Sequence, residues 1–290
     1  MSPTVALIAP GAMGAAIGRR LTDHGLDVWT CLEGCSAASL ERARAADLKN
    51  VPLASLMQAD LLLSVVPPAE AAALAERLAP FITQTETPPV YCDLNAVSTA
   101  TLARIERIVS DSGSAFVDGG IIGPPPSETK TPRIYAAGEN APALAKLSSY
   151  GLDVRILDGG IGSASALKMC FAGINKGMTA LTTIMLLAAG RSGAGEALRG
   201  ELAHSLPEVI ERIDHGIPDM LPKAWRWHPE MREIADFLDA ADPQGNDVAG
   251  RRAFEGFAAL YEHLGDVSTN DALIRQLETL IDATAGASRK

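Results

Sequence analysis

The stretch Val5–Gly25, VALIAPGAMGAAIGRRLTDHG, decides the fold that we expect for this chain. An apolar run typical of a buried strand leads into a turn that carries glycines, and an amphipathic helix pattern follows. Gly11 allows the backbone to approach a pyrophosphate, and Gly14 allows the helix to pack closely on the strand. The first position of the glycine motif is Ala9, which is tolerated if its φ stays negative. The stretch therefore predicts a dinucleotide-binding turn formed by Ala9, Gly11, Ala12, Met13 and Gly14.

The first half of the chain repeats this alternation of short apolar strands and helices, which is typical of a mostly parallel sheet with helices on both faces. After about residue 160 the strand patterns end and helical patterns continue, beginning with a long, apolar helix from Ser163 to about Ala189. The sequence therefore predicts an α/β Rossmann domain over residues 1–160 and an all-α domain over residues 161–290. The predicted strands are Thr4–Ala9, Asp27–Leu32, Asp60–Val66, Pro89–Asp93, Ala115–Asp118, Arg133–Ala137 and Val154–Leu157. The later helices are predicted at Ala194–His215, Pro229–Ala240, Arg251–Leu264 and Thr269–Thr284.

Charge and composition exclude several classes of protein. The chain has 290 residues and a formal net charge of −10, and its basic residues are scattered, so we expect no nucleic-acid partner. No apolar run is expected to reach the roughly 20 residues of a membrane span, and the N-terminus lacks a signal-peptide pattern. We therefore expect a soluble, cytoplasmic protein. The helix that begins at Ser163 is apolar on nearly all sides, which predicts that it is buried, in part against a second subunit of a homodimer.

The cysteines and histidines do not follow the spacing of a disulfide framework or a zinc site. The glycine turn lacks the Lys-Ser/Thr end of a P-loop, and the chain has no G-x-S-x-G nucleophile elbow. We therefore expect no metal, no nucleotide hydrolysis and no serine hydrolase chemistry.

Three further segments follow predicted strands and belong to the expected cofactor site. Glu33, in CLEGCS, lies about 20 residues past the glycines, where a carboxylate accepts hydrogen bonds from the adenosine ribose and repels a 2′-phosphate. It favours NAD slightly over NADP, although Ser36 and Arg42 stand close enough in sequence to meet a phosphate. Two later segments end strands as well, SVVPPAEA at residues 64–71 and DLNAVS at residues 93–98. They add Val66, Pro67 and Asn95 to the predicted cofactor site.

Together, these motifs resemble the β-hydroxyacid dehydrogenase family, which includes 3-hydroxyisobutyrate and 6-phosphogluconate dehydrogenases. The resemblance covers most of the chain. It rests on IAPGAMG, the VVPP loop, the DLN segment, FVDGGIIGPPP at residues 116–126 and GGIGSASALKMCFAGINKG at residues 159–177. The LEG after the second strand and the ALKM helix resemble a divergent branch of that family with a compact C-terminal domain.

The resemblance implies residues that bind substrate. The segment Asp118–Pro124 matches one that holds substrate through backbone amides and a serine. Glycines keep that backbone accessible here. The serine position is Ile122, which puts recognition by a hydroxyl in doubt and suggests a less polar substrate. The predicted substrate-binding residues are Gly119, Gly120, Ile122, Gly123 and Lys168.

The resemblance also implies a general acid/base, Lys168, six residues after Gly162. Burial on an apolar helix lowers the pKa of a lysine, so that its amine can take a proton from a hydroxyl or return one to a carbonyl. The asparagine that the family places four residues later is Ala172. Asn175, almost two turns from Lys168, is the residue we expect to orient substrate or lysine. Arg232 roughly matches a family Lys-Asp-Leu segment near the cofactor.

The sequence therefore predicts an NAD(P)-dependent oxidoreductase acting on a small β-hydroxy acid or related alcohol. Two alternatives stay open. One is an imine or ketone reductase of the same architecture, and the other is a protein that senses dinucleotide without turnover.

Overall fold

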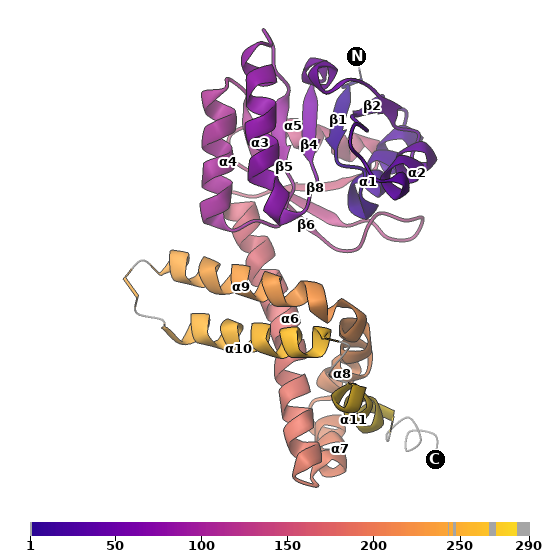
Figure 1. Cartoon of the computed structure of the whole chain (residues 1–290), viewed down its shortest axis with the longest axis vertical. Coiled ribbons are helices and arrows are strands. Elements are labelled where there is room, and N and C mark those ends of the chain that lie inside the picture. The colour runs from indigo at the N-terminus through magenta and orange to yellow at the C-terminus, as the bar shows by residue number, and fades with distance from the viewer. Residues whose placement is uncertain (1, 243, 246–247, 267–270, 283–290) are drawn as a thin grey trace. The chain divides into compact units, whose positions relative to one another are not determined.

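The computed structural model describes residues 2–242, 244–245, 248–266 and 271–282 (Figure 1). The chain divides into two compact units, Met1–Met169 and Cys170–Lys290. The division falls inside the helix α6 (Ser163–Arg191). Sequence patterns place the domain boundary earlier, near residue 160, where the strands end. The first turns of α6 belong to the first unit because they are bound to its sheet, as described below.

The first unit is built on a sheet of eight strands in the order β3-β2-β1-β4-β5-β6-β7-β8. Every neighbouring pair is parallel except β6 and β7, which are antiparallel. This mostly parallel sheet followed by a helical unit confirms the predicted fold class. The strands are β1 (Val5–Ile8), β2 (Val28–Thr30), β3 (Lys49–Asn50), β4 (Leu61–Ser64), β5 (Val90–Asp93), β6 (Phe116–Ile122), β7 (Arg133–Ala137) and β8 (Asp153–Ile156).

Helices cover both faces of this sheet, which is why β1 and β4 are apolar and buried at every position. One core layer contains residues of α1 (Ala12–Asp23), α2 (Ala37–Ala45) and α5 (Ala141–Ala145). The other contains residues of α3 (Pro68–Thr83), α4 (Thr99–Asp111) and the 3₁₀ segment Leu53–Gln58. The strand order reverses between β1 and β4, so the carboxyl ends of these strands form the switch point where open α/β sheets bind ligands.

Within its described residues, the helical unit holds the rest of α6, five further α-helices and the short 3₁₀ helix Leu221–Lys223. The predicted helix Ala194–His215 is two helices, α7 (Gly195–Ser205) and α8 (Pro207–Met220). The break falls before Pro207, which lacks the backbone N–H that a continuous helix needs and instead begins α8. The remaining helices are α9 (Ala224–Ala241), α10 (Val248–Gly265) and α11 (Asp271–Asp282). Both ends of the predicted helix Thr269–Thr284, residues 269–270 and 283–284, lie outside the described residues.

The helix α6 runs slightly further than the predicted Ser163–Ala189. In the described part of the chain, α6 is the one helix long and apolar enough to cross a membrane. Its mean hydropathy is 1.3 over 18 residues. Core helices of soluble proteins have the same composition, so the match is by length and composition only. The expectation concerned an uninterrupted apolar run, and Lys168, Asn175 and Lys176 interrupt the apolar residues of this helix.

Candidate active site and dinucleotide turn

Polar residues occupy one register row across three neighbouring strands of the sheet. Ser64, the last residue of β4, is paired in register with Asp93, the last residue of β5, and Asp93 is paired with Asp118 of β6. All three side chains are fully buried. Because neighbouring parallel strands are about 4.8 Å apart, this register holds two carboxyl groups and a hydroxyl close together in a site with little water.

Asn95 ties this row to the loop after β4. Its backbone N–H and its side-chain amide both donate to the Asp93 carboxylate, at 3.0 and 2.9 Å. The amide also donates to the Ser64 hydroxyl at 2.8 Å, and its oxygen accepts the backbone N–H of Val66 at 2.7 Å. The structure thus brings the predicted residues Asn95 and Val66 together. All the polar atoms of the Asn95 amide bind the protein, and they fix the loop of Val66 and the exposed Pro67.

The Asp118 carboxylate holds the beginning of α6. One oxygen accepts the backbone N–H groups of Gly162, Ala164 and Ser165, at 2.9, 2.9 and 3.3 Å. The other oxygen accepts the Ser165 hydroxyl at 2.6 Å. The first N–H groups of a helix have no partner within the helix, and a carboxylate satisfies them and complements the helix dipole. A single buried side chain therefore fixes the start of α6 against β6.

Gly120 of β6 allows that approach, and Gly119 beside it allows the close approach of Leu94. A Cβ on Gly120 would lie 2.7 Å from the Ala164 carbonyl oxygen and 3.4 Å from Lys168 Cβ, and one on Gly119 would lie 2.3 Å from Leu94 Cδ2. Both glycines are buried inside the strand and paired with β7. The expectation that they present an accessible backbone to substrate is therefore wrong, because the strand predicted to end at Asp118 continues to Ile122. The strand ends at Ile122, which is partly exposed. Gly123 follows it, is exposed and has a φ of +127°.

This packing places Lys168 beside the two buried carboxylates. Burial lowers the pKa of the Lys168 amine to about 8, although the negative charges of Asp93 and Asp118 oppose the shift. Burial likewise raises the pKa of Asp93 to about 6, although the hydrogen bonds from Asn95 oppose it. A lysine with a lowered pKa beside an acid with a raised pKa is the combination that proton transfer near neutral pH requires. Lys168 retains some contact with solvent, so its amine can be reached.

Sequence reasoning missed the carboxylates of Asp93 and Asp118 and the hydroxyls of Ser64 and Ser165. A signal for three of them was present. The apolar runs LLLS, VYCD and FVD each finish on a polar residue, at 64, 93 and 118. Since parallel strands end at one edge of a sheet, three such residues are expected to meet there.

The turn after β1 has the features of an anion site. A Cβ on Gly11 would meet no atom within 4 Å, whereas one on Gly14 would lie 2.2 Å from the Ala9 carbonyl oxygen. Gly11 therefore leaves room for a ligand, and Gly14 allows α1 to pack on the end of β1. The N-terminus of α1 has neither a side-chain cap nor an acidic residue in its first turn. Its free N–H groups, from Ala12 and Met13, suit the pyrophosphate of a dinucleotide.

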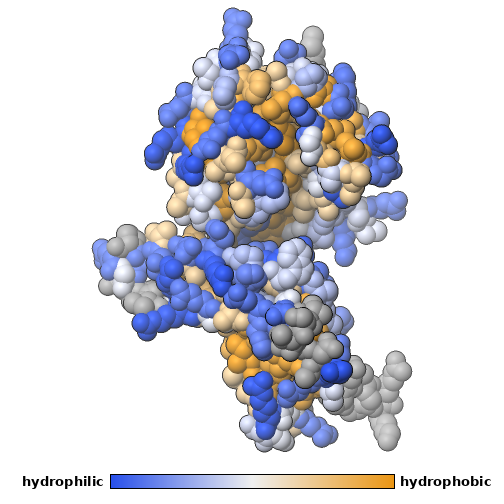
Figure 2. Space-filling view, in the orientation of Figure 1, coloured by the Kyte–Doolittle hydropathy of each residue, from blue (hydrophilic) through white to orange (hydrophobic). Residues whose placement is uncertain are grey.

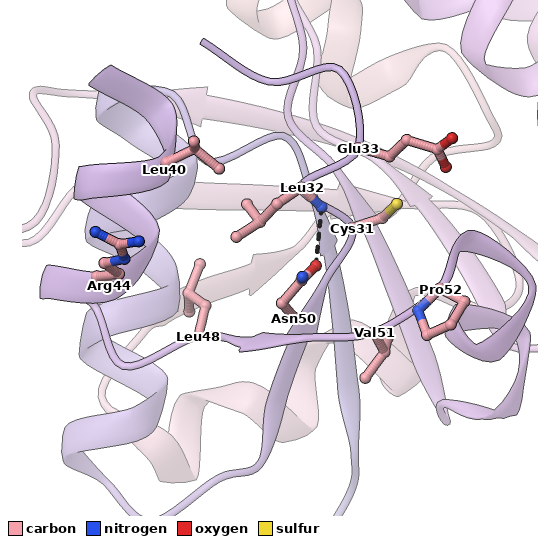
Figure 3. Close-up of a pocket in the computed structure, with 9 residues that line it drawn as sticks. All are labelled: Cys31, Leu32, Glu33, Leu40, Arg44, Leu48, Asn50, Val51 and Pro52. Carbon is pink, nitrogen blue, oxygen red and sulfur yellow. Dashed lines mark hydrogen bonds between the residues drawn. The ribbon is translucent and has the colours of Figure 1, made fainter. Parts of the chain in front are cut away.

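A hollow of about 710 Å³ lies at the carboxyl ends of β2 and β3 (Figure 3). Glu33 is exposed there, beside Cys31, on the side of the hollow opposite Leu40 and Arg44. The amide of Asn50 accepts the Leu32 N–H at 3.1 Å and holds the loop in place. The predicted ribose carboxylate thus stands at the end of β2. The lining residues are Cys31, Leu32, Glu33, Leu40, Arg44, Leu48, Asn50, Val51 and Pro52.

Two predicted residues belong to the helical unit, where they bind other partners. The Asn175 amide oxygen accepts from Arg212 Nη1 at 2.7 Å. Arg232 pairs with Glu262 at 2.8 Å, and both side chains are 56% exposed. The structure does not place either residue relative to Lys168, so their roles remain predictions.

Comparisons with known proteins agree with this architecture. Residues 189–264 match a family model described as a domain of unknown function, DUF1932. A conserved protein of unknown function, described as similar in structure to 3-hydroxyacid dehydrogenases, is 26% identical, with a TM-score of 0.73 over 90% of this chain and 97% of that one. The 3-hydroxyisobutyrate dehydrogenase of Mycobacterium tuberculosis, solved with L-serine, is 14% identical, with a TM-score of 0.72 over 97% and 99%. An imine reductase from Myxococcus stipitatus, solved with NADP⁺, is 18% identical, with a TM-score of 0.57 over 95% and 100%. These likenesses confirm the predicted resemblance at the level of the fold.

Proposed function

We propose that this chain, which has the two-domain fold of the 3-hydroxyacid dehydrogenases, is a nicotinamide-dependent oxidoreductase acting on a small β-hydroxy acid or related alcohol. The observation that carries the proposal is Lys168, held with a lowered pKa beside two buried carboxylates in the unit that carries the dinucleotide turn. The solved relatives that bind NAD⁺ or NADP⁺ support the choice of cofactor class.

Different residues serve cofactor binding and proton transfer. The N–H groups at the start of α1 would hold the pyrophosphate, and the loop fixed by Asn95 would contribute to binding the rest of the dinucleotide. When bound, the nicotinamide supplies the carbon that accepts or returns hydride. In alcohol oxidation the neutral amine of Lys168 accepts the hydroxyl proton as hydride leaves the adjacent carbon. In reduction the protonated amine returns that proton to the oxygen.

The substrate pocket is proposed to be less polar than that of a sugar acid dehydrogenase. Ile122 stands at the end of β6, where the resembling family has a serine. An apolar side chain there favours a short substrate whose carboxylate is bound elsewhere, at the exposed backbone of Gly123.

Replacing Lys168 with alanine tests this function. We expect NADH and NADPH to bind with unchanged affinity and turnover of a hydroxy acid panel to fall about 10²- to 10⁴-fold, because only the proton transfer is lost. Lys146→Ala, at an exposed position of the same unit, is the control. Unchanged turnover in Lys168→Ala would contradict the proposal. Imine reduction that survives while alcohol oxidation is lost would favour the reductase, and dinucleotide binding without turnover in the parent would favour the sensor.

The partner proposed for the helical unit is a second copy of the chain in a soluble, cytoplasmic homodimer. One face of α6 is apolar and exposed, with Phe171 at 52%, Ile174 at 66% and Leu181 at 52%. Together with Met178 and Met185 these residues repeat with the 3-4 spacing of a helix that packs along another helix. Figure 2 shows a hydrophobic area on the helical unit, below the polar surface over α9 and α10. Two copies of one stripe complement each other in an antiparallel pair, which makes the same chain the natural partner.

A further inference from the structure

Arg42 of α2 is bound to the turn that follows β1. Its Nε donates to the Pro10 carbonyl oxygen at 3.1 Å, and its Nη2 donates to the Ser39 hydroxyl at 2.9 Å. The Ser39 hydroxyl in turn accepts from Ser36 at 3.2 Å. The guanidinium thus connects α2 to the turn after β1, although Arg42 and Pro10 are 32 residues apart in the chain.

No carboxylate neutralises this guanidinium within the described residues. Ion pairs to acidic side chains are made by other arginines of the unit, among them Arg44, which lies 3.9 Å from Glu41 on the same helix. Arg42 has no such partner, and its third nitrogen, Nη1, makes no hydrogen bond to the described part of the protein. In a chain with a net charge of −10, a fixed cation without an acid is a candidate anion contact.

The position of Arg42 identifies the anion. Pro10 lies between Ala9 and Gly11, in the turn that binds a dinucleotide, and α2 follows directly from the end of β2. The adenosine ribose of a bound dinucleotide lies between this turn and the end of the second strand, where a carboxylate favours the ribose hydroxyls and an arginine favours a 2′-phosphate. We propose that Arg42 receives the 2′-phosphate of NADP(H) and sets a preference for NADP(H) over NAD(H). This proposal rests on the proposed function.

Glu33 predicts the opposite preference, for NAD(H). Its side chain is less constrained than that of Arg42. Glu33 is exposed and makes no hydrogen bond to the described residues, so its carboxylate can rotate away from a phosphate. Arg42 is partly buried and already oriented by two hydrogen bonds, so it loses little conformational freedom when it binds. The proposal therefore departs from the NAD preference that Glu33 alone predicts.

Calorimetric titration of the full chain with NADPH and NADH tests the proposal. We expect the parent to bind NADPH at least about 10-fold more tightly than NADH. Arg42→Met is expected to weaken NADPH binding by about 10- to 100-fold and to change NADH binding by less than about 3-fold, because only the phosphate loses charge-assisted hydrogen bonds. Arg107→Met, at an exposed position of α4 in the same unit, is the control and should change neither affinity.

Fragment binding to the parent needs no variant and keeps the test independent of folding. Adenosine 2′,5′-bisphosphate is expected to bind at least about 10-fold more tightly than adenosine 5′-monophosphate, by the same contact. Equal affinity of the fragments, an NADH preference in the parent, or an unchanged NADPH to NADH ratio in Arg42→Met would each overturn the proposal. So would loss of NADPH binding in Arg44→Met alone, which would place the phosphate in the hollow beside β3. Failure of the proposed function has a different signature, because then neither cofactor binds or Lys168→Ala retains turnover.

Discussion

Lys168 and Asp93 show how burial prepares two side chains for chemistry. Each is more easily neutralised than in water, because the sheet edge and α6 exclude solvent from the charged forms. The two shifts move in opposite directions and bring the pKa values to about 6 and about 8, so that both groups change charge close to neutral pH. Burial of such groups costs folding free energy, and pKa values shifted in this way are found most often at functional sites.

The pH dependence of turnover follows from the protonation state that each direction requires. Oxidation needs the neutral amine of Lys168, so its kcat/KM should rise with pH through a midpoint near 8 and level off above it. Reduction needs the protonated amine and should fall over the same range. Initial rates measured from pH 6 to 10 in both directions check this. Parallel profiles in the two directions would be incompatible with an acid/base role for Lys168.

Asp93→Asn should move that midpoint. The Asp93 carboxylate, ionised above about pH 6, raises the pKa of Lys168, so its removal should lower the midpoint for oxidation by a measurable fraction of a pH unit. The same pH series on the variant measures the shift. A midpoint displaced to higher pH would show that Asp93 does not act on Lys168 through its charge.

At the scale of elements, the contact between β6 and the start of α6 is the structural basis of the site. Gly120→Ala would place a Cβ 2.7 Å from the Ala164 carbonyl oxygen, and we expect the unfolding free energy to fall by about 1–3 kcal/mol, as in other overpacked cores. Urea unfolding followed by circular dichroism measures it. Gly160→Ala, where a Cβ meets nothing within 4 Å, is the control. Equal stability of the two variants would contradict the close contact.

The cap of α6 gives a second prediction at this scale. Asp118→Ala removes both carboxylate oxygens, which leaves the N–H groups of Gly162, Ala164 and Ser165 without their acceptor. The loss of unfolding free energy should be about 2–4 kcal/mol, above the usual cost of a lost cap, because the carboxylate serves three N–H groups and a hydroxyl. The same urea series measures it. A loss below about 0.5 kcal/mol would show that the cap contributes little.

At the scale of the whole molecule, the apolar stripe of α6 predicts the oligomeric state. Light scattering coupled to gel filtration should give about twice the chain mass of 30.3 kDa. Ile174→Glu should give the monomer mass, because a charge in a packed helical seam is not tolerated. Trp225→Glu is the matched control, since Trp225 is as exposed as Ile174, 65% against 66%, but lies on α9. A monomeric parent would exclude the dimer.

Local patterns were enough to predict a large part of this protein. The strand, turn and helix around Gly11 and Gly14, the mostly parallel sheet and the helix from Ser163 each depend on residues close together in the chain. Patterns failed where distant segments decide the structure. The glycines at 119 and 120 were interpreted as an open backbone, whereas Leu94 packs against Gly119 and α6, more than 40 residues later in the chain, packs against Gly120.

The sequence by itself therefore indicated the class of fold and the glycine turn, because short-range periodicity and glycine spacing encode them, and it indicated the lysine through the family resemblance. Only the tertiary structure decided which side chains surround that lysine and which cation stands beside the turn. The row of Ser64, Asp93 and Asp118 exists because three strands pair in one register, and Arg42 reaches Pro10 because α2 packs beside α1. Registers and packing distances arise from contacts between distant parts of the chain, which no local pattern of residues records.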